Sequence, residues 1–182
     1  MPEPVKSPAA VAGNPAQQAR YQVRFDVGAA GLDRVGNADV LVWVDALGLA
    51  DAAIATASPA LAVIAANLTD RSAAAAWVLA HQVELGRRVS IAVVAAGRDG
   101  EYSAADLLAA GAVIDALVTL GIDFTSPEAA VACAAFANLR NAVGHLFTAS
   151  VDGQNLADDG ERDRVVAAAR VDSSADVRVL RA

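Results

Sequence analysis

Apolar runs of strand length alternate with helical segments along this chain, and this alternation limits the folds that the chain can adopt. Three runs, at 40–45 (VLVWVD), 61–67 (LAVIAAN) and 88–97 (RVSIAVVAAG), are almost continuously apolar. Such runs are typical of strands that are buried on both faces. Strands that alternate with helices favour parallel pairing and helices on both sides of the sheet. We therefore predict an α/β fold, a three-layer sandwich with a largely parallel or mixed sheet.

The segments around these runs complete the predicted order of elements. Residues 21–27 (YQVRFDV) alternate in polarity, like a strand with one solvated face, and 28–37 form a short helix or turn. An Ala-rich helix ends before Ser58, and a second helix covers 70–87. Ser103 opens a long helix to about Leu120, with Asp106 in a capping-box-like position. Ser126 opens another helix, with proline in its first turn.

The two ends of the chain differ in character. Residues 1–18 contain four of the six prolines and have no periodic apolar pattern, so we predict a flexible tail there and a single domain over 19–182. Residues 141–170 predict short helices that are broken at Gly144, Gly153 and Gly160. Residues 176–180 predict a terminal strand.

Charge and composition exclude several classes of partner. The net charge is −7 and the isoelectric point is near 4.7, which argues against binding to nucleic acid or to an acidic membrane. Cys133 is the only cysteine, so no intramolecular disulfide can form. No run resembles a signal peptide or a membrane span, and we expect a cytoplasmic protein. The Ala-rich helices suit a homodimer interface and core packing equally well.

Polar residues follow three of the predicted strands, at the edge where ligands bind in open α/β sheets. Asp45 and Asn67 each end an apolar run, and Gly97 with Arg98 ends a third. A carboxylate and an amide suit Mg²⁺, and a guanidinium suits phosphate oxygens. Polar residues also end buried strands in α/β proteins without any function, and that alternative stays open for each position.

Other candidates are weaker. Asp106 is expected to interact with the first turn of its own helix, where a negative charge suits the helix dipole. The pair at 152–153 reads as a turn, and the acidic stretch 158–163 reads as a solvated face. His81 and His145 have no partner at ligand spacing. The chain also lacks the common dinucleotide, P-loop, nucleophile-elbow and zinc-protease motifs.

Four segments in order carry a resemblance to a known family. They are VRFDVGAAGL, ADVLVWVDALG, VVAAGRDGEYSAADLLAAGAVIDAL and the C-terminal stretch SVDGQNLADDGERDRVVAAARVDSSADVRVL. Together they resemble the 2-phosphosulfolactate phosphatases, magnesium-dependent enzymes of coenzyme M biosynthesis. The likeness covers about Arg20 to Leu180. It implies the α/β phosphatase fold, Mg²⁺ as cofactor and a small anionic phosphate ester as substrate.

The resemblance also implies roles for individual positions. Asp45 and Asp106 would be catalytic and would hold the metal. The substrate contacts would be Asn67, Arg98, Ser150 and Gly153. Further positions that match the family pattern without an assigned role are Gly97, Gly111 and Asp163.

Departures from the family pattern leave two functions open. The residues after Asp45 are Ala-Leu-Gly, Ala105 stands where a Glu is expected, and only 21 residues separate Asp45 from Asn67, where the family has a longer segment. One hypothesis is an active Mg²⁺-dependent phosphatase. The other is a degenerate, non-catalytic relative that binds a small anion or a protein partner. The residues alone favour the second hypothesis. The four segments in the family's order nevertheless make the family the best single description of the chain.

Overall fold

The structure, a computed structural model, describes residues 14–48, 52–99 and 101–182. A five-stranded sheet with the order β1-β4-β2-β3-β5 forms its centre. Strands β1 to β4 are parallel, and β5 runs antiparallel to β3 at the edge. The prediction of a mixed sheet is therefore confirmed. The strands are β1 (Val23–Val27), β2 (Val40–Val44), β3 (Ala62–Ala66), β4 (Ile91–Ala95) and β5 (Arg178–Arg181).

The apolar runs form strands because both faces of the sheet are covered. Along β2, Val42 and Val44 join one hydrophobic cluster, whereas Leu41 and Trp43 join a second cluster on the opposite face. Successive side chains of a strand point to opposite faces, so each face needs its own apolar residues. This explains why the three central strands are continuously apolar.

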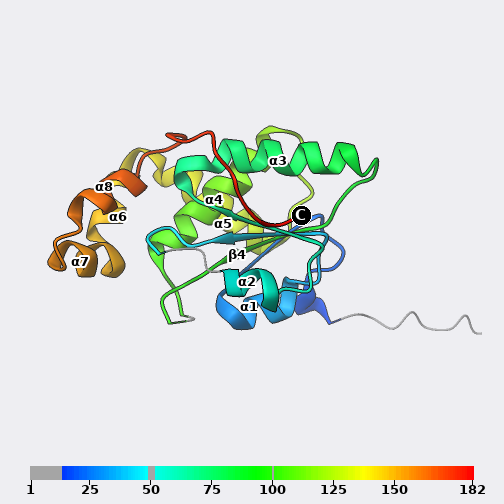
Figure 1. The fold of residues 1–182 in the computed structure, drawn as a ribbon, viewed down its shortest axis with the longest axis horizontal. Helices are drawn as coiled ribbons and strands as arrows, with labels where there is room; N and C mark the ends of the chain where they lie inside the picture. Colours follow the sequence, from blue (N-terminus) through cyan, green and yellow to red (C-terminus); the bar gives the residue numbers. More distant parts are fainter. Residues whose placement is uncertain (1–13, 49–51, 100) are drawn as a thin grey trace, which may run out of the picture.

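Helices form the two outer layers (Figure 1). The helices α1 and α2 lie on one face, α3, α4 and α5 cover the other, and α6, α7 and α8 gather at one end of the sheet. This arrangement confirms the three-layer sandwich. The helices are α1 (Gly28–Val35), α2 (Ala52–Ala57), α3 (Arg71–Glu84), α4 (Ala104–Thr119), α5 (Pro127–Leu139), α6 (Val143–Ala149), α7 (Val151–Asp158) and α8 (Arg162–Ala168), with short 3₁₀ turns η1 (Pro15–Gln17), η2 (Leu68–Asp70) and η3 (Arg140–Ala142).

The central helix α4 is buried around most of its circumference. Its predicted start is confirmed, because the Ser103 hydroxyl accepts a hydrogen bond from the N–H of Asp106. Gly111 lets α5 approach closely: a Cβ at this position would lie 2.1 Å from the carbonyl oxygen of Ala132. Among the described residues, no helix is both long enough and apolar enough to cross a lipid bilayer.

Two predicted helix breaks are wrong. Gly144 lies inside α6, and Gly153 lies inside the first turn of α7. The chain turns instead at Ser150, the residue that caps α7. Gly160 does separate two helices, as predicted, and its φ of +83° suits a residue without a side chain. The short stretch at 152–153 is therefore helical and not a free turn.

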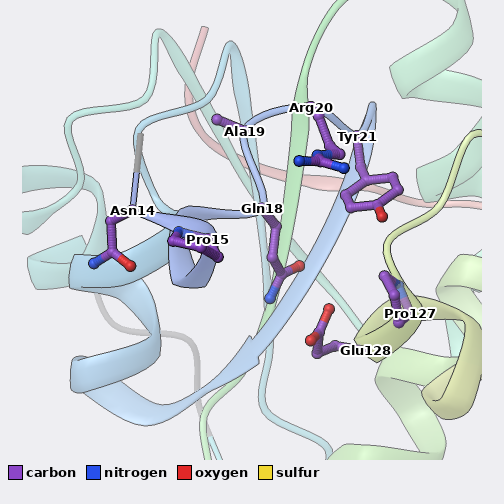
Figure 2. Close-up of a pocket in the computed structure, with 8 residues that line it drawn as sticks. All are labelled: Asn14, Pro15, Gln18, Ala19, Arg20, Tyr21, Pro127 and Glu128. Atoms are coloured by element: carbon purple, nitrogen blue, oxygen red, sulfur yellow. The ribbon is translucent and has the colours of Figure 1, made fainter. Parts of the chain in front are cut away.

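Part of the predicted tail packs against the sheet. Residues 1–13 lie outside the described residues, but Pro15–Gln17 form η1. The Gln18 side chain points from η1 toward β1 (Figure 2), where it donates to the carbonyl of Phe25 at 2.9 Å and accepts from its N–H at 3.0 Å. β1 is an edge strand of the sheet. Gln18 makes the two hydrogen bonds to the Phe25 backbone that a neighbouring strand would otherwise make.

Candidate functional site

A cleft of about 410 Å³ lies at the carboxyl ends of β2 and β4. Three of the predicted residues, Asp45, Arg98 and Asp106, line it together. They come from three different segments, so the fold brings them together as the strand-end argument expects. The cleft is closed by four residues of α7 and α8 that are not among the predicted metal or substrate contacts, namely Asp152, Asn155, Leu156 and Arg164.

Asp45 stands directly after β2, in a tight turn. Its Oδ1 accepts the N–H of Gly48 at 2.7 Å. Gly48 leaves the room that this carboxylate needs, because a Cβ there would lie 2.1 Å from Oδ2. The side-chain amide of Asn67 donates to the backbone carbonyl of Asp45 at 2.8 Å. The end of β3 thereby fixes the end of β2.

Asp106 holds the ends of two strands. Its Oδ1 accepts the N–H of Ala46 at 2.7 Å, and its Oδ2 accepts the N–H of Gly97 at 2.9 Å. Asp106 does lie in the first turn of α4, as predicted. Its carboxylate, however, binds the strand ends and not the N–H groups of its own helix, because the parallel strands end directly in front of α4. Gly97 has a φ of +72°, and a Cβ there would lie 2.1 Å from the carbonyl of Glu101. Only glycine fits this turn.

Each carboxylate of the cleft makes the ionisation of its neighbours less favourable. Burial raises the pKa of Asp106 to about 6, and the neighbouring charges of Asp45 and Asp152 act in the same direction, against two backbone hydrogen bonds that lower it. Burial also raises the pKa of Asp45; the Gly48 N–H and Arg164 oppose this change, and Asp152 adds to it. A cation in the cleft would relieve this repulsion.

Asp152 and the two arginines of the cleft differ in how firmly they are held. The hydroxyl of Ser103 donates to Asp152 at 2.8 Å, whereas Arg98 stays 3.8 Å from the same carboxylate. Arg164 donates to the carbonyl of Leu47 and to the carboxylate of its neighbour Glu161. The guanidinium of Arg98 is therefore held less firmly than that of Arg164.

Three predicted substrate contacts do not line the cleft. Ser150 caps α7: its hydroxyl donates to the carbonyl of Phe147 and accepts the N–H of Gly153 at 3.0 Å. Gly153 is pressed against Phe147, where a Cβ would lie 1.9 Å from the carbonyl oxygen. Asn67 supports Asp45 from behind, and its Oδ1 is buried without a hydrogen-bond partner among the described residues.

The missed residues gave only faint sequence signals. Asp152 lies between Ser150 and Gly153, in the very stretch that resembles the family, but the pair at 152–153 suggested a turn. Arg164 follows an acidic stretch that indicated a solvated surface. Only the packing of α7 and α8 against the strand ends brings these two side chains to Asp45.

The oxygen ligands of the cleft suit an open Mg²⁺ site but not a site that protein side chains enclose. Within the described ranges, no three His, Cys, Asp or Glu side chains are placed to enclose an ion. Mg²⁺, however, is commonly held by one or two carboxylates together with waters and substrate phosphate. Asp45 and Asp152 fit such an open site, since both line the cleft and repel each other. Asp106 fits less well, because backbone N–H groups bind both of its oxygens.

A larger hollow, of about 510 Å³, lies away from these strand ends. Figure 2 shows its lining, which comes from η1, the residues before β1 and the start of α5. Its charged side chains are Arg20 and Glu128. This hollow lacks the converging carboxylates of the smaller cleft, and we therefore place the candidate site at the smaller one.

Comparison with known proteins identifies the family of the chain. The family model described as 2-phosphosulpholactate (2-phosphosulfolactate) phosphatase matches residues 50–182, more than half of the chain. The match includes the cleft residues Arg98, Asp106, Asp152 and Arg164, and Asp45 lies just before it. No curated protein matches the chain significantly. The chain belongs to the 2-phosphosulfolactate phosphatase family.

Proposed function

We propose that this chain is a Mg²⁺-dependent phosphatase that hydrolyses a phosphomonoester of a small anionic hydroxy acid, with 2-phosphosulfolactate as the first candidate. One observation carries the proposal. Asp45, Arg98 and Asp106, which come from separate segments, line a single cleft at the carboxyl ends of β2 and β4. Family membership supplies the reaction class.

The proposed roles follow from the contacts of each side chain. Asp45 and Asp152 hold the cation, and the loosely paired Arg98 binds the phosphate oxygens. Arg164, fixed by the Leu47 carbonyl, adds positive charge near Asp45. A bound Mg²⁺ would polarise the phosphoryl group and stabilise the charge that develops during transfer. Asp106 is a positioning residue, because it holds the turns that carry Asp45 and Gly97.

The local charge of the cleft matters because the chain as a whole is acidic, with a net charge of −7. Such a surface repels an anionic ester at long range. Arg98 and Arg164 supply two positive charges where the ester would bind. Without a cation, the four aspartates that line the cleft, Asp45, Asp99, Asp106 and Asp152, outnumber them. The proposal therefore requires that activity depend strictly on a divalent metal.

Phosphate release tests the proposal directly. The purified chain is incubated with 2-phosphosulfolactate and a panel of small phosphomonoesters, with Mg²⁺ and with EDTA. We expect release only with the metal, and a fall in kcat/KM of about a hundredfold or more in Asp45→Asn. Asp33→Asn, an exposed aspartate of α1, is the matched control and keeps wild-type rates. Absence of metal-dependent release from every ester would overturn the proposal.

The second candidate function is a non-catalytic relative that binds a small anion or a protein partner. One observation favours it: both oxygens of Asp106 serve backbone N–H groups, as expected of a purely structural aspartate. Calorimetric titration with MgCl₂ separates the candidates. Binding that Asp45→Asn abolishes supports the phosphatase, and no binding to the wild-type chain supports the alternative.

A further inference from the structure

A second cleft, of about 280 Å³, lies at the opposite end of the same strands. It opens where β2 and β4 begin, beside the start of β1. Asp39 at this end and Asp45 at the other are separated by the length of β2, about 20 Å at the usual rise per residue. We call it the basic cleft and define it by five of its lining residues, Arg20, Arg24, Asp39, Arg88 and Ser90.

Arg24 forms the buried wall of the basic cleft. The residue is only 8% exposed, although its position on β1 suggested a solvated face. Its guanidinium donates to the carbonyls of Asn37 at 2.9 Å, Tyr21 at 3.4 Å and Ala19 at 3.5 Å. None of these partners carries a charge, and two of the bonds are long. Burial consequently lowers the pKa of Arg24, while Asp39 partly opposes this change.

Asp39, the one acidic residue that lines the basic cleft, is committed to other partners. Its Oδ1 accepts from Arg87 at 2.6 Å. Its Oδ2 accepts from the N–H of Ser90 at 2.7 Å and from the hydroxyl of Ser90 at 2.8 Å. The Arg87 guanidinium holds the pKa of Asp39 well below its usual range. The negative charge of Asp39 is thus largely offset by Arg87, outside the cleft lining.

Two further arginines, Arg20 and Arg88, line the same cleft and are exposed. Neither forms an ion pair within the described part of the chain. Three arginines against one neutralised aspartate give this cleft a local positive charge, in a chain whose net charge is −7. A buried guanidinium whose hydrogen-bond partners are all uncharged carbonyls gains stability when an anion approaches it.

We propose that the basic cleft is a second binding site, for a small oxyanion such as phosphate or the phosphate group of a metabolite. Arg24 contacts the anion from the buried side. Arg20 and Arg88 contact the anion from the solvent side. The volume suits a group of a few heavy atoms rather than a nucleotide or a peptide. The site is independent of the proposed phosphatase reaction, since the whole sheet lies between the two clefts.

Titration with inorganic phosphate, followed by ¹H–¹⁵N NMR at low ionic strength, tests this inference. Phosphate can also enter the cleft at the other end, so the readout must be local. The amides of Gln22 and Ser90 report on the basic cleft, and those of Gly48 and Gly97 report on the carboxyl-end cleft. We expect saturable shifts at Gln22 and Ser90.

Variants decide which side chains bind the anion. The double variant Arg20→Ser/Arg88→Ser changes only exposed side chains and should weaken phosphate binding at Gln22 and Ser90 about tenfold or more. Arg98→Ser and the exposed Arg162→Ser should leave it unchanged. The inference is overturned by the absence of saturable shifts at about 10 mM phosphate, or by equal affinity in the double variant and in Arg162→Ser.

Discussion

Asp106 accepts a hydrogen bond from the N–H of Ala46 at 2.7 Å, across 60 positions of the chain. The same carboxylate accepts the N–H of Gly97 at 2.9 Å. One side chain at the start of α4 therefore joins the ends of β2 and β4, the two strands whose ends form the cleft. The geometry of the cleft depends on this junction.

Replacing Asp106 by Asn should destabilise the fold at pH 7. An amide presents one acceptor and one donor, so its NH₂ would face the N–H of either Ala46 or Gly97. A buried donor left without an acceptor costs about 1–3 kcal/mol. Urea unfolding measures the free energy of unfolding. Asp99→Asn is the control, because Asp99 lines the same cleft but is exposed; equal stability of the two variants would contradict the prediction.

The stability that depends on Asp106 should fall as the pH rises from about 4 to about 7. Burial, and to a lesser degree Asp45 and Asp152, raises its pKa from 3.8 to about 6 in the folded state. The folded chain then binds the proton more tightly than the unfolded chain. The resulting stabilisation is complete below about pH 4 and is lost as the pH passes about 6, by up to about 3 kcal/mol.

The unfolding free energies of wild type and Asp106→Asn, compared across this range in metal-free buffer, isolate this effect. A protonated Asp106 still accepts both N–H groups, so the gap between the two proteins should widen on acidification. Asp39 and Asp172, whose pKa values are lowered, change stability in the opposite sense but equally in both proteins. A gap that is constant or narrows in acid would show that the carboxyl does not titrate as stated.

Two glycine-to-alanine changes should have opposite effects on stability. In Gly111→Ala the added Cβ would lie 2.1 Å from the carbonyl of Ala132, and separating α4 from α5 should cost about 1–3 kcal/mol. Gly144→Ala meets nothing within 4 Å inside α6, and should stabilise the chain by about 0.5–1 kcal/mol. Thermal unfolding midpoints check both signs. Destabilisation by Gly144→Ala would refute the placement of this residue in α6.

Ser150→Ala separates a capping role from a substrate role. The hydroxyl caps α7 through the N–H of Gly153, so its loss should lower the free energy of unfolding by about 0.5–2 kcal/mol. Because Ser150 does not line the cleft, the KM for any accepted phosphate ester should not change. A large increase in KM without loss of stability would restore the role that the family resemblance implied.

The sheet is predictable from the sequence because the apolar runs of its central strands are a signal in themselves. The runs at β2, β3 and β4 are apolar on both faces, as expected of strands that are covered on both sides. β1 was less readable. Its alternation suggested a solvated face, but Arg24 is buried because the residues before β1 and Asn37 supply carbonyl partners. Such partners come from the folded chain and leave no local pattern.

The candidate site was predictable only where it follows strands. Asp45 and Arg98 are predictable because parallel strands end at a common edge. Asp152 and Arg164 reach the same cleft from short helices more than 50 positions further along the chain. Their spacing contains no metal-ligand or phosphate motif, so only tertiary packing reveals them. The same limit explains why Asp106 was assigned to its own helix.

Paramagnetic broadening by Mn²⁺, which accepts the oxygen ligands that suit Mg²⁺, tests most directly whether the carboxyl-end cleft holds a divalent ion. In ¹H–¹⁵N spectra of the full chain, substoichiometric Mn²⁺ should broaden the amides of Gly48 and Gly97 first and leave those of Gln22 and Ser90 sharp. Asp45→Asn should remove this selectivity. Uniform broadening, or broadening at Gly48 and Gly97 that survives in Asp45→Asn, would contradict the proposed site.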